Sequence, residues 1–401
     1  MRLKVINQAK NLAGKRVVMR VDFNTPLIKG KVLDNSRLVA VIPTLRLLEK
    51  AGSKQVMLVS HLGRPNGKIV QSLSLRPIAR ELSRLLKRKV KLISLSHAFQ
   101  TKAANEPLVL LENIRFLPGE EKNDKKLAQQ LASLGDIFIN DAFSVSHHPS
   151  ASLVGITRYL PSYAGLSFAH EVQELNRVAG QSAKPLVAII GGAKVADKLP
   201  VIEKILSRVD YILVGGVVAN TFLKAKGHKI GKSLFDKSLV AQARAVLKKC
   251  KRKIILPSDV IVDLTSTKKK EHTLVSINKV SSQHRIMDLG TETIQQYSAV
   301  VKKAKTVIWA GTLGKTEELV YAHGSRSLGR LVSARARRST FVVVGGGDTV
   351  GFFHQNRLWV DHFSLAGGAS LKFLAGEKLP ALVPLLTSTT RTLSILTYQL
   401  L

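Results

Sequence analysis

Cationic and hydrogen-bonding side chains close the apolar runs in the first half of the sequence. The group comprises Arg20, Asp22, Asn24, His61, Arg64, Arg115, His147 and His148, and Arg37 opens a predicted helical stretch shortly after the first run. Arginine presents a planar fork of N–H donors, which binds a carboxylate or a phosphate in bidentate fashion. We therefore expect these residues to bind a small acid that carries phosphate or carboxylate. For any single arginine of the group, a structural ion pair is the alternative.

Glycine, rather than arginine, closes the apolar runs in the second half. The segment Gly345–Thr349, GGGDT, follows the run TFVVV and opens a predicted helix. Glycine lets the backbone approach phosphate oxygens, and the free N–H groups at a helix N-terminus bind them. Asp348 could hold Mg²⁺, which usually takes one or two carboxylates. The segment thus predicts a phosphate and magnesium site, with a tight turn capped by Asp348 as the alternative.

Two lysines in GGAKVADK, Lys194 and Lys198, lie four residues apart directly after an apolar run. This spacing predicts that both lie on one face of a helix, from which two ammonium groups can reach a transferring phosphoryl group. Two solvated lysines are the alternative.

Two segments resemble nucleotide-binding motifs but do not match them. Gly231-Lys232-Ser233 resembles the end of a P-loop, but Lys226 stands where that motif requires glycine. The segment Gly345–Val350 is a near miss to the G-x-G-x-x-G fingerprint, and nothing else supports a nicotinamide site.

The elements that position these residues are short apolar runs separated by helix-length stretches such as LVAVIPTLRLLEKAG and VIEKILSRV. Continuous apolar runs are typical of parallel strands covered on both faces, and their alternation with helices predicts βαβ units. Ligands of such folds bind outside the carboxyl ends of the strands. The predicted strands are 16–23, 55–60, 89–94, 108–114, 136–143, 185–192, 211–218, 253–262, 306–312, 340–349 and 362–368.

The fold class predicted from this pattern is α/β, with two Rossmann-like, doubly wound parallel-sheet domains joined by a hinge helix. A chain of 401 residues is long enough for two or three domains. The predicted parts are an acid-binding domain at 1–168, a connecting helix at 169–184, a nucleotide-binding domain at 185–380, and a segment at 381–401 that returns to the first domain.

Composition excludes several classes of protein. Apolar residues make up 45% of the chain, which argues against disorder, and a single cysteine, Cys250, excludes an intrachain disulfide. The N-terminus lacks the apolar region of a signal peptide, and no apolar run reaches the ~20 residues of a membrane helix. We expect a soluble, cytoplasmic protein.

The charge of the chain is strongly positive, with 62 Lys and Arg against 27 Asp and Glu and a net charge of +35. Phosphate backbones attract such charge, so nucleic-acid binding is an alternative function. The basic clusters at 248–253, 267–270 and 326–338 are scattered, however, and none has the spacing of a nucleic-acid-binding motif. Solvated basic faces are the favoured interpretation.

The motifs together resemble those of the phosphoglycerate kinase family over residues 5–380. The matching segments include RVDFNTPL, SHLGRPNGK, LLENIRFLPGEEKND, NDAFSVSHHPSAS, GGAKVADKLPVIEKIL, VGGVVANTFLKAKGHKIGKSLFD, GGGDT and AGGASLKFLAGEKLP. The resemblance implies a monomeric glycolytic kinase that transfers the acyl phosphate of 1,3-bisphosphoglycerate to ADP. It implies in-line, Mg²⁺-assisted transfer on closure of two domains, with 3-phosphoglycerate and ATP as products.

The resemblance also assigns residues. Catalysis is assigned to Arg37, Lys194 and Lys198, and Mg²⁺ binding to Asp348. Phosphoglycerate binding is assigned to Asp22, Phe23, Asn24, Arg37, His61, Leu62, Gly63, Arg64, Arg115 and His148. Nucleotide binding is assigned to Lys198, Gly215, Gly216, Gly290, Glu317, Gly346, Gly347, Asp348 and Thr349.

The sequence departs from the family pattern near these ligand-binding residues. The family's GTAHRAH is SVSHHPS here, so His148 replaces an arginine, and WNGPMGVFE is WAGTLGKTE. The latter change brings in Ala310, Thr312 and Thr316. Ala366 replaces the first glycine of GGGAS, the turn at Gly290 lacks its proline, and 387–401 has no counterpart. A catalytically impaired member of the same fold is therefore a second alternative function.

Overall fold

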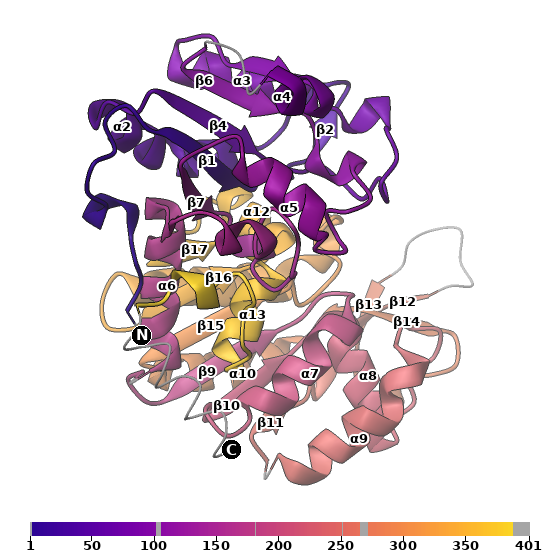
Figure 1. Ribbon diagram of the computed structural model, residues 1–401. Helices are drawn as coiled ribbons and strands as arrows, with labels where there is room; N and C mark the ends of the chain where they lie inside the picture. Colours follow the sequence, from indigo (N-terminus) through magenta and orange to yellow (C-terminus); the bar gives the residue numbers. More distant parts are fainter. Residues whose placement is uncertain (1, 102–105, 181, 251, 265–271, 388–401) are drawn as a thin grey trace. The chain divides into compact units, whose positions relative to one another are not determined.

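The structure is a computed structural model that describes residues 2–101, 106–180, 182–250, 252–264 and 272–387 (Figure 1). The chain divides into two compact units. Unit 1 comprises Met1–Gln173 with Lys378–Leu401, and unit 2 comprises Glu174–Glu377. The cluster at 267–270 and the segment 388–401 lie outside the described residues.

Unit 1 is built on a six-stranded sheet in the order β5-β6-β4-β1-β7-β8, in which every pairing is parallel. The central strand β1 pairs with β4 on one side and with β7 on the other. The carboxyl ends of these three strands therefore lie next to one another. The strands are β1 (Arg16–Val21), β4 (Gln55–Val59), β5 (Lys91–Ile93), β6 (Leu108–Leu111), β7 (Ile137–Asp141) and β8 (Ser162–Ala164).

Both faces of this sheet are buried, as its continuous apolar runs predict. Val17 and Met19 of β1 belong to a core shared with the first three helices, whereas Val18 belongs to a core shared with the next two. Successive side chains of a strand point to opposite faces, so helices on both faces are needed to bury them. The helices are α1 (Ser36–Ala40), α2 (Ile42–Lys50), α3 (Arg76–Leu86), α4 (Leu95–Thr101) and α5 (Lys125–Ala132), and a hairpin joins β2 (Leu27–Ile28) to β3 (Lys31–Val32).

Unit 2 contains a second parallel six-stranded sheet, in the order β11-β10-β9-β15-β16-β17. The predicted α/β class with two doubly wound parallel sheets is thus confirmed. Val187, Trp309 and Val344 lie in one core with residues of the helices α10 (Thr291–Lys303) and α11 (His323–Ala336). The strands are β9 (Leu186–Ile190), β10 (Tyr211–Val214), β11 (Ile254–Ile255), β15 (Thr306–Ala310), β16 (Phe341–Gly345) and β17 (His362–Ser364).

The helices of unit 2 follow these strands, as expected for βαβ units. Helices α7 and α8 pack against each other (Figure 1). Helix α10 packs against α11. Their bounds are α7 (Val195–Ile205), α8 (Gly216–Lys226), α9 (Val240–Lys249), α10 (Thr291–Lys303), α11 (His323–Ala336), α12 (Gly347–Gln355) and α13 (Gly368–Leu374).

A small antiparallel sheet in unit 2 was not predicted from the sequence. Its order is β13-β12-β14, with β12 (Asp259–Leu264) between β13 (His272–Ser276) and β14 (His284–Leu289). The prediction of one strand over 253–262 is wrong, because the first part of that run is β11 of the parallel sheet and the second part is β12. Pro257 lies between them, and proline has no backbone N–H with which to continue a ladder.

The segment 169–184, predicted to connect the domains, overlaps the helix α6 (Leu166–Ala179), which ends five residues before the predicted boundary. The boundary between the units, Gln173/Glu174, falls within this helix. The end of the described chain belongs to unit 1, where the backbone of Leu385 accepts a hydrogen bond of 2.8 Å from Lys4 and Thr387 donates one of 3.0 Å to Arg2.

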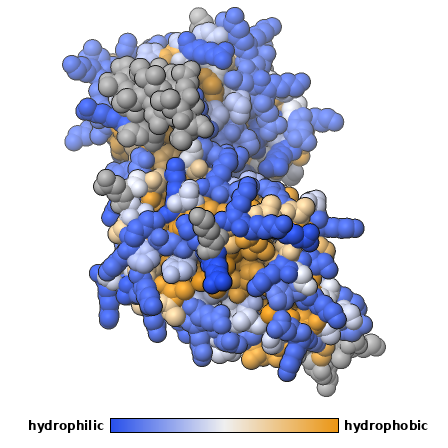
Figure 2. All heavy atoms as spheres, turned by 90° about the horizontal axis from the view of Figure 1, so that it is seen from below, coloured by the Kyte–Doolittle hydropathy of each residue, from blue (hydrophilic) through white to orange (hydrophobic). Residues whose placement is uncertain are grey.

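Several basic residues occupy helix C-termini, such as Lys302 and Lys303 of α10 and Arg335 of α11. A cation at this end interacts favourably with the helix dipole, which accounts for part of the basic surface. Figure 2 shows hydrophilic side chains over most of one face of the molecule, with apolar areas between them. Among the described residues, no helix combines the length and the apolar character that a membrane span requires.

Candidate functional site

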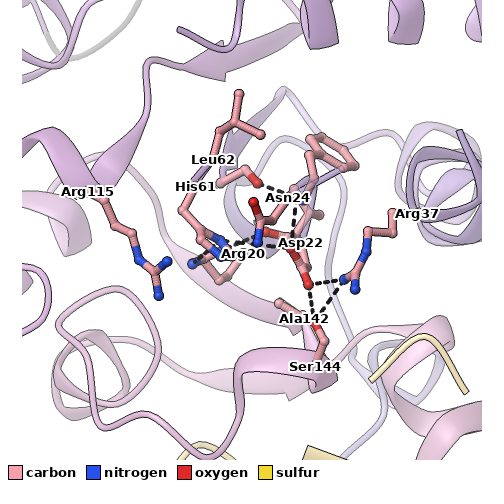
Figure 3. Close-up of polar contacts among 12 residues, drawn as sticks. Arg20, Asp22, Asn24, Arg37, His61, Leu62, Arg115, Ala142 and Ser144 are labelled. Atoms are coloured by element: carbon pink, nitrogen blue, oxygen red, sulfur yellow. Dashed lines mark hydrogen bonds and ion pairs between the residues drawn. The ribbon is translucent and has the colours of Figure 1, made fainter. Parts of the chain in front are cut away.

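The Asp22 carboxylate is the centre of a polar cluster in unit 1, at the carboxyl ends of β1, β4 and β7. Asp22 directly follows β1, Arg37 lies in α1, and Ser144 follows β7. Arg37 and Ser144 both donate short hydrogen bonds to Asp22, and Arg37 also contacts the Ser144 hydroxyl at 3.3 Å. Figure 3 shows the three side chains converging from their separate elements. The tertiary structure thus holds the Arg37 guanidinium in a defined place.

Asp22 is almost completely buried, yet it is charged. Burial alone would raise the pKa of its carboxyl group. The positive charge of Arg37, together with the hydrogen bonds from Ser144 and the Asn24 N–H, outweighs this effect and holds the pKa at about 2. Asp22 is therefore a permanent counter-charge to the cations around it.

His61 lies on the other side of Asp22 and is only 2% exposed (Figure 3). Its Nδ1 is 3.2 Å from a guanidinium nitrogen of Arg20 and 3.9 Å from the nearer Asp22 oxygen. Burial lowers the pKa of His61 well below its usual value, and Arg20, Arg115 and Arg37 lower it further against the opposing effect of Asp22. The ring is therefore neutral at physiological pH.

Arg20 connects His61 to two residues that sequence reasoning missed, Ser152 and Glu120. The Arg20 Nε donates to Ser152 Oγ at 2.8 Å, and Ser152 Oγ donates to Glu120 Oε1 at 2.6 Å. The Ser152 backbone N–H donates to the other Glu120 oxygen at 3.0 Å. Both residues lie in motifs of the resemblance, LLENIRFLPGEEKND and NDAFSVSHHPSAS, but no spacing within either motif signals the contact.

Phe23 and Asn24, which directly follow Asp22, form hydrogen bonds with the loop after β4. The Phe23 N–H donates to Ser60 Oγ at 2.9 Å, and Asn24 Oδ1 accepts from the Gly63 N–H at 3.0 Å. Gly63 has a φ of +61°, a conformation that favours glycine, and a Cβ there would lie 2.8 Å from the Leu73 side chain. These bonds join the loop after β1 to the loop after β4.

Arg115 is held by protein partners, whereas Arg64 is exposed. Arg115 donates to the Gly63 carbonyl at 2.8 Å and pairs with Glu121 at 3.3 Å, and burial lowers its pKa. Arg64 is exposed. Leu62 is buried, and its carbonyl accepts a hydrogen bond of 2.7 Å from Asn113. The main chain around 62–64 is thus held firmly while the Arg64 side chain faces solvent.

His148 is exposed and its ring lies against that of His147, with 3.9 Å between ring centroids. The two histidines follow the short 3-10 helix η4 (Phe143–Val145), whose Ser144 contacts Asp22. His148 therefore lies four positions after Ser144 along the chain.

Unit 2 contains a cavity of about 540 Å³ at the carboxyl ends of β9, β15 and β16. Its lining includes Lys194, Lys198, Gly216, Glu317, Gly346, Gly347, Asp348 and Thr349, all expected there from the sequence. Lining residues that sequence reasoning did not single out include Asn220, Leu234, Arg285, Met287 and Lys315. Asn220, Leu234 and Lys315 lie within segments quoted for the resemblance, whereas Arg285 and Met287 belong to β14 and no quoted motif contains them.

One end of the cavity is the N-terminus of α12, where Gly346 is the N-cap with a φ of +94°. Thr349 Oγ1 accepts a hydrogen bond of 2.7 Å from the Gly311 N–H, which fixes this turn against the end of β15. Asp348 is exposed in the first turn, where it is the second residue of the helix and not its N-cap. The prediction that Asp348 could serve as a helix N-cap is therefore wrong, and its carboxylate faces the cavity.

The prediction that Lys194 and Lys198 share one helix face is wrong, because α7 begins at Val195 and Lys194 is its N-cap residue. Lys198 is in the first turn, where its ammonium group donates to the carbonyls of Gly191 and Ala310, the latter at 3.2 Å. Burial lowers the pKa of Lys198 to about 8, against the opposing effect of Asp348 and Asp197. Both lysines nevertheless line the cavity.

Gly215 and Gly290 are not among the lining residues of this cavity. A Cβ on Gly215 would lie 2.6 Å from Leu313, and one on Gly290 would lie 2.2 Å from Asp259, so close packing requires glycine at both positions. Gly290 is the N-cap of α10. Their expected contact with nucleotide stays a prediction.

The residues at the α12 end of the cavity fit a bound magnesium ion that shares its ligands with phosphate. Within the described part of the chain, no group of three or more His, Cys, Asp or Glu side chains could hold a metal by itself. Asp348 offers a single exposed carboxylate beside an anion-binding helix N-terminus. Mg²⁺ commonly takes one or two protein carboxylates and completes its shell with phosphate oxygens and water.

Comparison with known proteins gives a consistent result. The family model described as phosphoglycerate kinase matches residues 6–377. A phosphoglycerate kinase of Moorella thermoacetica is 41% identical over 384 residues, covering 93% of this chain and 97% of the relative. One of Bartonella bacilliformis is 39% identical over 399 residues, covering 96% and 99%. The solved structure of phosphoglycerate kinase from Coxiella burnetii is 37% identical with a TM-score of 0.83, covering 97% of this chain and 99% of its own.

Proposed function

Because the chain belongs to the phosphoglycerate kinase family, we propose that the two clusters described above divide that family's reaction between them. The protein is a phosphotransferase of glycolysis. It transfers the acyl phosphate of 1,3-bisphosphoglycerate to ADP, which gives 3-phosphoglycerate and ATP. We assign residues to acid binding, to nucleotide binding and to the transfer step as follows.

The cluster around Asp22 binds the three-carbon acid. Arg37, Arg64 and Arg115 supply charged donors for its phosphate and carboxylate groups, and the neutral His61 supplies one further donor. Asp22 keeps its negative charge, which holds Arg37 in place without neutralising the whole cluster. The side chain of His148 and the loops of Phe23, Asn24, Leu62 and Gly63 complete the site.

The cavity of unit 2 binds the nucleotide. The N-terminus of α12, with Gly346, Gly347 and Thr349, presents backbone N–H groups to the phosphates, and Lys194 and Lys198 add positive charge. Glu317 is assigned to the ribose. Asp348 would hold Mg²⁺, which would supply charge neutralisation to the nucleotide phosphates.

The chemistry demands positioning and charge stabilisation rather than acid–base catalysis. In the direction of ATP consumption, the substrate carboxylate is already a good nucleophile, so no general base is required. Arg37 and Lys198 stabilise the negative charge on the transferring phosphoryl group, and each such donor in a water-poor site is worth ~2.7–4 kcal/mol. The arginine cluster orients the attacking oxygen.

The acid and the nucleotide are assigned to different units, so the proposal requires the units to bring both ligands together before transfer. Closure also excludes water, which would otherwise hydrolyse the acyl phosphate. The helix α6, which contains the boundary between the units, is the proposed hinge. The native protein is proposed to act as a monomer in the cytoplasm.

The cavity of unit 2 is the observation that carries the proposal, because it brings the GGGDT turn together with Lys194, Lys198 and Glu317. The test is a coupled assay of ATP formation from 1,3-bisphosphoglycerate and ADP, with purified protein and Mg²⁺. Turnover that is lost when Mg²⁺ is chelated supports the proposal. A protein that binds both ligands without forming ATP contradicts it and indicates the impaired alternative.

A further inference from the structure

We propose that Glu120 and Ser152 are positioning residues that act through Arg20 to fix the proton of His61 on Nε2. The inference rests on the proposed function, in which His61 donates a hydrogen bond to the bound acid. It concerns the buried side of the cluster around Asp22, whose residues have no assigned role in ligand binding. The chain of contacts runs from Glu120 to Ser152, then to Arg20, and ends at His61.

Every member of this chain is withdrawn from solvent. The exposed fractions are 2% for Glu120, 1% for Ser152, 1% for Arg20 and 2% for His61. Its three hydrogen bonds measure 2.6, 2.8 and 3.2 Å in that order. A polar chain that is buried throughout has no water with which to exchange partners, so its geometry fixes the role of each atom.

Arg20 determines which nitrogen of His61 can carry a proton. A guanidinium group has only donors, so the His61 Nδ1 that faces it must be the acceptor. The competing partner of Nδ1 is the Asp22 carboxylate, which would need Nδ1 to be protonated, but its oxygen is 3.9 Å away. With Nδ1 as acceptor, a neutral ring carries its single proton on Nε2 and can donate it to an anion.

Glu120 explains why Arg20 can hold this position. A buried guanidinium is costly unless it is paired and hydrogen-bonded. Glu120 is the strongest favourable charge acting on Arg20, ahead of Asp22, and its two oxygens clamp the hydroxyl and the backbone N–H of Ser152. Ser152 in turn accepts from the Arg20 Nε. The Glu120 carboxylate therefore orients the Arg20 guanidinium indirectly, through the Ser152 hydroxyl.

The test measures the ring nitrogens of His61 directly in the free protein, by NMR of selectively labelled histidine. The His61 signal is assigned from its disappearance in His61→Gln. The wild type is expected to show an unprotonated Nδ1 and a protonated Nε2 from pH 6 to pH 8. In Ser152→Ala, Arg20 loses the acceptor of its Nε, and we expect a mixture of tautomers with a ring that titrates closer to the usual histidine range. Glu120→Gln is expected to change the spectrum in the same direction.

Binding of 3-phosphoglycerate, measured by calorimetry, supplies the second readout. Ser152→Ala is expected to bind about tenfold more weakly, the equivalent of one hydrogen bond to a charged group. Ser152→Thr keeps the hydroxyl and should restore both tautomer and affinity. The matched control is Ser162→Ala, a buried serine of the same unit whose hydroxyl donates to the Leu160 carbonyl at 2.8 Å. It should leave both readouts as in the wild type.

A wild-type tautomer in both Ser152→Ala and Glu120→Gln overturns the inference, as does an equal loss of affinity in Ser162→Ala. If Ser152→Ala does not fold, the tautomer in Glu120→Gln decides the outcome. A failure of the proposed function is distinguishable, because His61→Gln would then bind 3-phosphoglycerate as the wild type does. The tautomer in the free protein would still decide whether Glu120 and Ser152 position the ring.

Discussion

The guanidinium of Arg37 is hydrogen-bonded to the carboxylate of Asp22, although the two residues belong to separate elements of unit 1. Because Asp22 is buried with a pKa of about 2, the pair persists throughout the physiological pH range. The contact gives the proposed catalytic arginine a fixed starting position. It also keeps the carboxylate from being a free negative charge in a site for anions.

Replacement of Arg37 by alanine is expected to lower turnover by about 100- to 1000-fold, the typical effect of removing one stabilising donor from a transition state. ATP binding should be unchanged, because the nucleotide cavity belongs to unit 2. Steady-state kinetics and calorimetry check the two parts. Arg16→Ala is the matched control, because Arg16 forms an ion pair of 3.1 Å with Asp136 in the same unit but outside the cluster. Retained turnover in Arg37→Ala would remove this residue from catalysis.

Affinity for ATP is expected to fall as pH rises above 8. Burial lowers the pKa of Lys198 to about 8, so the free protein loses this ammonium charge in mildly alkaline solution. Phosphate binds the charged form of Lys198 more tightly. Above pH 8, binding therefore requires the lysine to take up a proton from solution, which weakens the measured affinity. In Lys198→Arg the charge is permanent, so the decline between pH 7.5 and pH 9.5 should be absent in titrations of nucleotide. Lys204→Arg, at an exposed lysine paired with Glu377, should keep the wild-type profile.

Replacement of His148 by arginine is expected to lower the KM for 3-phosphoglycerate, by up to about tenfold. A guanidinium is charged at every working pH and binds phosphate in bidentate fashion, whereas imidazole loses its charge across the neutral range. Kinetics at pH 8 in low and high salt check the effect, which salt should reduce. His97→Arg adds the same charge at an exposed position of α4. An equal gain in that control would show a general effect of charge rather than a contact of residue 148.

The stability of unit 1 is expected to depend on the protonation of Asp141. Its carboxylate accepts hydrogen bonds from Thr44 at 2.6 Å and from the Phe168 N–H at 2.8 Å, at the start of α6. Burial raises the pKa of Asp141 from 3.8 to about 7, against the effect of these bonds. The folded state therefore binds a proton more tightly than the unfolded state, and this group costs stability as pH rises from about 4 to 7.

Asparagine does not titrate, so this pH dependence should disappear in Asp141→Asn. Between pH 4 and pH 8 the free energy of unfolding of the variant should therefore rise relative to that of the wild type, by a few kcal/mol at most. Urea unfolding at several pH values measures the difference. At Asp136, hydrogen bonds from Arg16 outweigh burial and lower the pKa of the carboxyl group. Asp136→Asn should therefore lose stability relative to the wild type as the pH rises. A constant difference between wild type and Asp141→Asn would show that Asp141 does not titrate in this range.

Local patterns in the sequence were sufficient for the α/β class and for most strands. The apolar run of β1 buries Val17, Val18 and Met19 on alternating faces, and such a run predicts a covered strand without knowledge of its neighbours. The same reasoning locates chemistry, because side chains that follow parallel strands must meet at one edge of the sheet. It failed at 253–262, where one apolar run serves two sheets, and at Lys194, which precedes its helix.

The sequence by itself determined which chemical groups stand at the strand ends: arginines and His61 in unit 1, and glycines with Asp348 in unit 2. Only the tertiary structure decided their partners. Ser152 is 132 positions from Arg20 and 32 from Glu120, yet one chain of hydrogen bonds joins the three. Helix and strand periodicities report burial over a few residues, whereas a buried charge selects its partner from whatever packing brings within hydrogen-bond distance.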